Sequence, residues 1–128
     1  VRILELIDEA SDLLYLEEKV KTNVSDEMIE ADFSLMSIVF KNLIDNAYKY
    51  GENLEIKVDD HRVCFISSGE ALSKDLTYYT EAFSKGRETN TQKGFGLGLY
   101  IVSEILKKHD MNFYYEHKLG QNIFIIRR

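Results

Sequence analysis

The sequence predicts an α+β fold, with one largely antiparallel sheet and helices packed on one of its faces. Two observations lead to this prediction. Two pairs of segments with alternating apolar residues are each joined by a short turn, which is typical of β-hairpins. Elsewhere, apolar residues recur at helical spacing over longer segments. The chain has 128 residues, 45% of them hydrophobic, so we expect residues 1–128 to form a single domain with its own core.

The N-terminal part predicts two helices separated by strands. Helical spacing of apolar residues predicts a helix over roughly residues 5–15. Alternation predicts a strand over 19–24, and a second short strand at 28–31. A long helix then runs from about residue 32 or 34 to Tyr50, and Gly51 follows it as the C-cap.

Two hairpins complete the predicted sheet. Alternating apolar residues over 54–58 and 62–67 flank an Asp-Asp-His turn, which predicts the first hairpin. The same pattern over 111–115 and 123–126, with a Leu-Gly-Gln turn between them, predicts the second.

The stretch between the hairpins is less regular. Residues 70–93 show no strong period apart from a short predicted helix near 76–83. Residues 86–93 contain no aliphatic side chain, which indicates a mobile loop. Helical spacing resumes over 96–109 and predicts the last helix.

Composition excludes some function classes. Acidic residues outnumber basic ones by 22 to 16, for a net charge of −6, which argues against a nucleic-acid-binding surface. Cys64 is the single cysteine, so no internal disulfide can form and a reducing compartment is expected. No apolar stretch approaches the roughly 20 residues that span a bilayer, so we expect no direct membrane insertion.

The long helix carries a polar stripe. Asn42, Asn46 and Lys49 are four and three residues apart, so they lie within about 60° of one another around the helix axis. The first half of the helix is apolar nearly all round, so this stripe should face a pocket. Asparagine offers an oxygen to a hard cation and an amide donor to phosphate, and lysine adds a positive charge. The alternative is that the two asparagines cap or bridge neighbouring strands.

A glycine-rich run precedes the last helix. Gly94, Gly96 and Gly98 allow the backbone to approach a ligand closely, and the helix start offers unpaired N–H groups. Both features favour a polyphosphate ligand. No strand comes directly before the run and no Gly-Lys-Ser/Thr follows, so it is neither a dinucleotide-binding fingerprint nor a P-loop. Taken alone, the run also fits a flexible loop that ends in a helix.

These motifs together resemble the catalytic and ATP-binding domain of bacterial sensor histidine kinases, and the resemblance covers nearly the whole chain. The domain belongs to a superfamily with DNA gyrase, mismatch-repair ATPases and the large heat-shock chaperone. Asn42–Tyr50 matches the family's asparagine motif closely, and Gly94–Leu99 matches its second glycine motif. Ser67–Gly69 falls where the first glycine motif lies, and Glu81–Lys85 resembles the phenylalanine motif.

The resemblance implies a Bergerat-type fold. This is a two-layer sandwich of a mostly antiparallel mixed sheet, with three main helices on one face and a flexible ATP lid, here residues 84–95. It also implies that the chain is the C-terminal fragment of a longer sensor kinase. The fragment would lie in the cytoplasm, and its parent would be anchored in the inner membrane.

The resemblance also assigns roles around Mg-ATP. Asn46 would coordinate Mg²⁺, Lys49 would contact the terminal phosphate and Tyr50 would pack against the adenine. Asn42, Lys49 and Lys85 would be the catalytic residues. The positions expected to contact the nucleotide are Asn42, Asn46, Lys49, Tyr50, Ser67, Gly69, Phe83, Gly94, Gly96, Leu97, Gly98 and Leu99.

One position separates the reactions of the superfamily. Hydrolysing members have a glutamate that activates water where this chain has Asn42, and asparagine cannot act as a general base. The resemblance therefore implies a protein-histidine kinase that transfers the γ-phosphoryl group to a histidine on a separate dimerisation domain of the same parent. A response regulator would be an indirect partner.

Two positions depart from the family pattern. Ser67 replaces an aspartate whose carboxylate accepts a hydrogen bond from the adenine amino group, a change that could cost about 1 kcal/mol. Ala71 replaces a glycine. These departures leave open a catalytically degenerate nucleotide-binding or partner-docking module and a serine kinase of the anti-sigma type. A hydrolysing ATPase is a third alternative, for which we expect almost no phosphate release.

Overall fold

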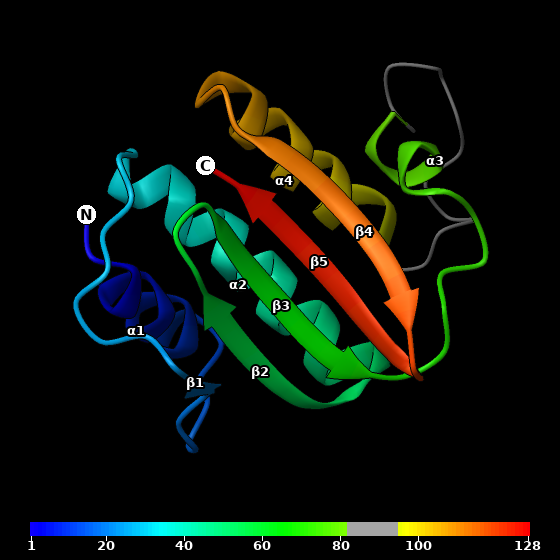
Figure 1. Cartoon of the computed structure of the whole chain (residues 1–128), viewed down its shortest axis with the longest axis horizontal. Coiled ribbons are helices and arrows are strands. Elements are labelled where there is room, and N and C mark those ends of the chain that lie inside the picture. The colour runs from blue at the N-terminus through cyan, green and yellow to red at the C-terminus, as the bar shows by residue number, and fades with distance from the viewer. Residues whose placement is uncertain (82–94) are drawn as a thin grey trace.

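The computed structural model describes residues 1–81 and 95–128 (Figure 1). The helices in these ranges are α1 (Ile3–Leu13), α2 (Phe33–Tyr50), α3 (Leu76–Thr80) and α4 (Phe95–Lys108). The strands are β1 (Lys21–Thr22), β2 (Glu52–Val58), β3 (Arg62–Ser68), β4 (Asn112–Lys118) and β5 (Gln121–Arg127). The predicted lid falls largely on residues 82–94, which lie outside the described ranges.

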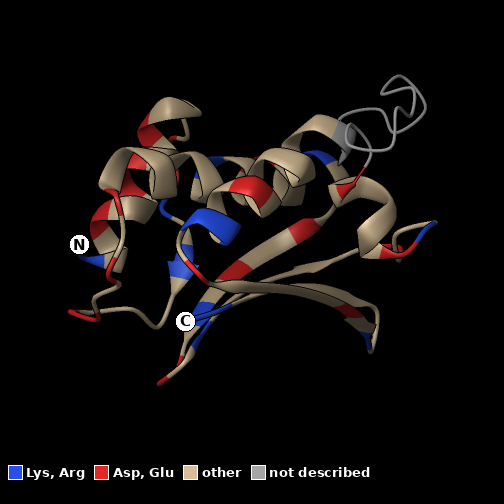
Figure 2. Ribbon diagram, turned by 90° about the horizontal axis from the view of Figure 1, so that it is seen from above, with Lys and Arg blue, Asp and Glu red and all other residues tan. Residues whose placement is uncertain are grey.

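The strands form one mixed sheet in the order β1-β2-β3-β5-β4. β1 runs parallel to β2, and the remaining neighbours are antiparallel. Helices α1, α2 and α4 cover one face of this sheet (Figures 1 and 2), and short α3 lies beside α4 (Figure 1). The predicted two-layer α+β architecture and both predicted hairpins are therefore confirmed.

The core lies between the sheet and the three long helices. Alternate residues of the central strands point to the helices, so that Phe65 on β3 pairs with Phe124 on β5, and both are buried. The ring of Phe40, on α2, meets Phe65 edge to face, with ring centroids 5.1 Å apart. This packing fixes α2 across the middle of the sheet.

The first predicted strand is much shorter than expected. Side-chain hydrogen bonds to β2 stand where backbone pairing was expected. Thr22 Oγ1 donates to the Ile56 carbonyl (2.7 Å), and Asn23 Oδ1 accepts from the Val58 N–H (2.9 Å). These side chains take the place of a backbone ladder. The predicted strand over 28–31 is wrong, since only an isolated bridge joins Met28 to Arg2.

Helix bounds differ slightly from the prediction. α1 begins at Ile3 rather than residue 5, and α4 at Phe95 rather than 96. α3 ends at Thr80, short of the predicted residue 83, and residues 82 and 83 are outside the described ranges. α2 begins where the Asp32 side chain accepts a hydrogen bond from the Leu35 N–H (2.8 Å), as expected for an N-cap.

Gly51 follows α2 as predicted, but for a different physical reason. Its backbone is extended (φ −154°, ψ −169°), not left-handed as a helix-ending glycine often is. A Cβ at Gly51 would lie 2.7 Å from the Ser68 carbonyl oxygen and 3.0 Å from Ser67 Oγ. Glycine is therefore required because the end of β3 passes too close for a side chain.

The turn between β2 and β3 is held by Asp59. Its carboxylate accepts from the backbone N–H groups of His61 (3.1 Å) and Arg62 (2.9 Å). It also accepts two hydrogen bonds from the Arg62 guanidinium, at 3.0 and 2.8 Å. These contacts, the Arg62 side chain first among them, lower the pKa of Asp59 from 3.8 to about 2.

Candidate functional site

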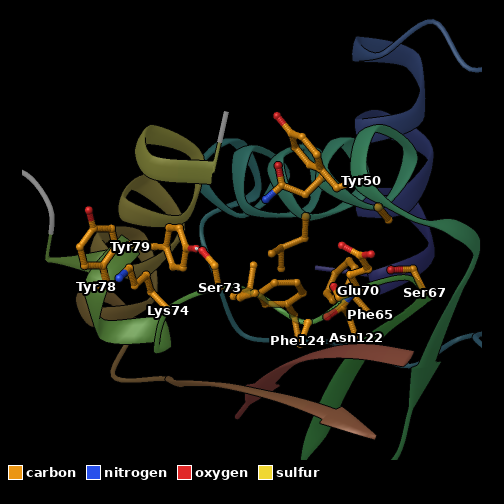
Figure 3. Close-up of a pocket in the computed structure, with 15 residues that line it drawn as sticks. Tyr50, Phe65, Ser67, Glu70, Ser73, Lys74, Tyr78, Tyr79, Asn122 and Phe124 are labelled. Atoms are coloured by element: carbon orange, nitrogen blue, oxygen red, sulfur yellow. Dashed lines mark hydrogen bonds between the residues drawn. The ribbon is translucent and has the colours of Figure 1, made fainter. Parts of the chain in front are cut away.

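A cavity of about 420 Å³ opens between α2, the helix-facing side of β3 and β5, and the segment from Glu70 to Tyr79 (Figure 3). Its walls combine apolar side chains with a few buried polar ones, a composition typical of small-molecule sites. The apolar lining includes Leu43, Ala47, Phe65, Leu72 and Phe124. The buried polar lining consists of Asn46, Ser67 and Asn122.

Asn46 lines this cavity and has an unused hydrogen-bond donor. The residue is only 6% exposed, and its Nδ2 has no hydrogen-bond partner in the described part of the chain. Buried amide groups are almost always paired, and an unpaired one costs about 1–3 kcal/mol. Asn46 is therefore placed to bind a polar ligand.

Asn42 lies one turn earlier on α2, against the start of α4. A Cβ built on Gly98 would stand 3.4 Å from Asn42 Oδ1. The structure thus brings together the asparagine motif and the last glycine of the glycine run. In the same turn of α4, the Leu97 side chain is exposed and that of Leu99 is fully buried in the core, so Leu99 could meet a ligand only through its backbone.

Lys49 does not line the cavity. Its side chain is exposed, and its Nζ lies 3.0 Å from Asp45 Oδ2, one helical turn away. This hydrogen bond, together with the carboxylate charge, raises the pKa of Lys49. The expected polar stripe is therefore divided: Asn46 faces the cavity, Asn42 packs against α4, and Lys49 pairs on the surface.

The remaining predicted residues lie in or beside the cavity, in α4, or outside the described residues. Tyr50 lines the cavity from the α2 side, and Ser67 lines it from β3 (Figure 3). Gly69 lies beside it, where a Cβ would be 3.1 Å from the Tyr50 carbonyl oxygen. Gly96 is within α4. Outside the described residues lie Phe83, Lys85 and Gly94.

The sequence-based prediction missed a hydrogen-bonded chain that holds one wall. Tyr115 on β4 accepts from the Leu72 N–H (3.0 Å) and donates to Asn122 Oδ1 on β5. Asn122 Nδ2 donates in turn to the Glu70 carbonyl (2.9 Å). These bonds fasten residues 70–72 to the sheet. The available signal was an asparagine on the inward face of an otherwise apolar strand.

The far end of the cavity is aromatic and carries a positive charge. Tyr78 and Tyr79 of α3 meet edge to face, and Ser73 Oγ lies 3.2 Å from the Tyr79 hydroxyl. Lys74 Nζ stands 5.9 Å from the centroid of the Tyr78 ring. Among the described lining residues Lys74 is the one cation, and the sequence-based prediction did not single it out.

Two further properties of the described residues concern metal-binding clusters and membrane-spanning helices. Residues 1–81 and 95–128 contain no group of three or more His, Cys, Asp or Glu side chains that could hold a metal ion. Within the same ranges, every helix is too short or too polar to cross a bilayer.

Comparison with known proteins identifies the family. Residues 31–127 match the family model for histidine kinase-, DNA gyrase B- and HSP90-like ATPases. The sensor histidine kinase ArsS of Helicobacter pylori is 30% identical over 95% of this chain, and the sensor protein KdpD of Clostridium acetobutylicum is 32% identical over 82% of it. The chain spans 30% of the length of ArsS and 13% of that of KdpD.

Solved structures agree with this assignment. The catalytic domain of the histidine kinase ThkA superposes with a TM-score of 0.75 at 25% identity, covering 99% of this chain and 91% of that one. The mycobacterial sensor histidine kinase MprB shares the fold, with a TM-score of 0.70 at 18% identity, over 99% of this chain and 95% of that one. The chain belongs to the histidine kinase-, gyrase B- and HSP90-like ATPase family, and is similar to the catalytic domains of sensor histidine kinases.

Proposed function

We propose that this domain binds Mg-ATP in the cavity beneath α2 and donates its γ-phosphoryl group to a histidine on a separate dimerisation domain of the parent protein. The observation that carries the proposal is Asn46, buried on the cavity wall with an unpaired amide. Membership of the ATPase family and similarity to sensor kinases support it. The parent would act in two-component signalling from the cytoplasmic side of the membrane, with a response regulator as the next acceptor.

The donor set fits a magnesium ion that is shared with phosphate. Mg²⁺ prefers oxygen ligands and keeps several of its waters, and it is often bound by one or two protein groups plus substrate phosphates. The described chain has no acidic cluster that could hold it alone. The Asn46 amide would offer Oδ1 to the ion and leave Nδ2 to donate to a phosphate oxygen.

Positioning is the main task of the protein in phosphoryl transfer. Asn42, beside Gly98, would orient the phosphates near the first turn of α4, whose free N–H groups favour negative charge. Lys49 would reach the terminal phosphate only after exchanging its bond to Asp45, and Lys85 remains a proposed γ-phosphate ligand. Asn42 cannot deprotonate water, so hydrolysis by the isolated domain should be slow.

The decisive experiment supplies the missing acceptor. The domain is mixed with the histidine-bearing dimerisation domain of its parent and labelled ATP, and phosphohistidine is followed over time. Asn46→Ala should abolish labelling and weaken Mg-ATP binding at least about tenfold, while Asn112→Ala, an exposed change at the start of β4, should do neither. A folded, nucleotide-bound domain that never labels the histidine would refute kinase activity.

A second candidate is a nucleotide-binding module without transferase activity. Lys49 pairs with Asp45 on the surface instead of lining the cavity, and Ser67 replaces the family's carboxylate. This candidate predicts binding of Mg-ATP with no labelling of the histidine, so the same experiment distinguishes the two. A serine kinase of the anti-sigma type would label a partner serine instead.

A further inference from the structure

The buried floor of the cavity carries only neutral hydrogen-bonding groups among the described lining residues. Ser67 and Asn122 are 6% and 8% exposed, and they stand opposite each other on β3 and β5. The two charged lining side chains, Glu70 and Lys74, are both exposed. The buried lining residues themselves therefore offer a ligand no fixed charge.

The two floor residues differ in how far they are already engaged. Asn122 uses its Oδ1 for the Tyr115 hydroxyl and its Nδ2 for the Glu70 carbonyl, which fixes the orientation of its amide. The Ser67 hydroxyl makes no hydrogen bond to any residue in the described ranges. Its Oγ is not among the fully buried unpaired atoms of the described residues, so it is open to a ligand or a water molecule. Ser67 thus provides the unpaired hydrogen-bonding group at the floor of the cavity.

The surroundings of Ser67 fit a planar aromatic base. The apolar side chains of Ala47, Phe65 and Phe124 line the cavity with it, and such walls match the faces of a purine. The polar groups suited to phosphate, Asn46 and Asn42, belong to α2 and lead toward the start of α4. The base of a bound nucleotide would accordingly lie over β3 and present an edge to Ser67.

We propose that this pocket takes 6-oxopurine nucleoside triphosphates as well as ATP, because Ser67 can bind either edge. This inference rests on the nucleotide binding proposed above. A hydroxyl has one donor hydrogen and two acceptor lone pairs, and it rotates freely to suit its partner. It can accept from the 6-amino group of adenine or donate to the 6-oxo group of hypoxanthine or guanine. A carboxylate only accepts, and so would favour the 6-amino group alone.

The test compares Mg-ATP with Mg-ITP by titration calorimetry on the full chain. ITP carries the 6-oxo group without the 2-amino group of guanine, so it isolates the edge that Ser67 reads. The two dissociation constants should agree within about tenfold. Ser67→Asp should weaken the binding of ITP at least about tenfold relative to the binding of ATP. Ser68→Asp adds the same charge on the opposite face of β3. It should leave the ratio of the ITP and ATP dissociation constants as in the wild type.

A third variant keeps the inference testable if Ser67→Asp does not fold. Ser67→Ala removes the hydroxyl and should weaken both nucleotides to a similar degree, by about threefold to tenfold. Unchanged affinities in Ser67→Ala would overturn the role of Ser67. Wild-type binding of ATP with ITP weaker by more than about tenfold would overturn the inference and leave the proposed function standing. Binding of neither nucleotide would overturn both.

Discussion

Tyr115 allows a sharp test of how the cavity wall is held. Its hydroxyl accepts from the Leu72 N–H and donates to Asn122 Oδ1, so it joins the segment before α3 to the sheet. Burial raises the pKa of this hydroxyl, which therefore remains a neutral donor and acceptor at physiological pH. Tyr115→Phe removes the oxygen and keeps the ring, whose centroid lies 4.9 Å from that of Phe124.

The expected loss follows from the two hydrogen bonds. A typical hydrogen bond contributes about 1 kcal/mol net, so the variant should lose about 2 kcal/mol of unfolding free energy. With an unfolding entropy of about 2.1 cal/mol/K per residue, a chain of 128 residues should melt about 7 °C lower. Nucleotide affinity should also fall, because residues 70–72 form part of the cavity wall.

Thermal unfolding followed by circular dichroism measures the first effect. Tyr114→Phe is the matched control, because Tyr114 is 48% exposed on the opposite face of β4 and its hydroxyl bonds to no residue in the described ranges. Amide exchange at Leu72 measures the local effect, and should speed up in Tyr115→Phe alone. A melting temperature equal to that of Tyr114→Phe, with unchanged exchange at Leu72, would refute the role assigned to Tyr115.

Two further predictions concern the frame around the site. Gly51→Ala should lower the unfolding free energy by about 1–3 kcal/mol in urea titration, because its Cβ would stand 2.7 Å from a backbone oxygen; Gly98→Ala, with 3.4 Å to a side chain, should not. Equal midpoints for the two variants would contradict this. Asp59 has its pKa lowered from 3.8 to about 2, so its contribution is present above the higher value and lost as pH falls through the lower one. The difference in melting temperature between wild type and Asp59→Asn should therefore close as the pH falls from about 4 to about 2, and a difference that persists there would rule out this cause.

The parts of the fold that depend on short-range sequence patterns could be predicted from the sequence. Both hairpins follow from alternating side chains and turn residues that are close in the chain. The first strand was overestimated because Thr22 and Asn23 use their side chains where the pattern suggested backbone pairing. The strand predicted at Met28 fails because its partner, Arg2, provides a single bridge.

The part of the site that lies on one helix could be predicted from the sequence. The spacing of Asn42 and Asn46 on α2 predicted the buried amide that the cavity contains. Lys49 was expected on the pocket side but lies outside the cavity lining, because a carboxylate at i−4, Asp45, offers it a nearer partner than the cavity does. Asn122 was missed because its importance depends on the register that sets it opposite Ser67, and that pairing joins residues far apart in the sequence.

The pairing of β3 with β5 has a consequence for how the chain can vary. Each hairpin closes a short loop, whereas the β3–β5 ladder brings together Ser68 and Gln121 and so closes one large loop that contains α3, α4 and β4. Loop-closure entropy grows only with the logarithm of length, and doubling such a loop costs about 0.6 kcal/mol. Changes of length in the connections of this large loop should therefore cost little free energy, while both hairpins stay in register.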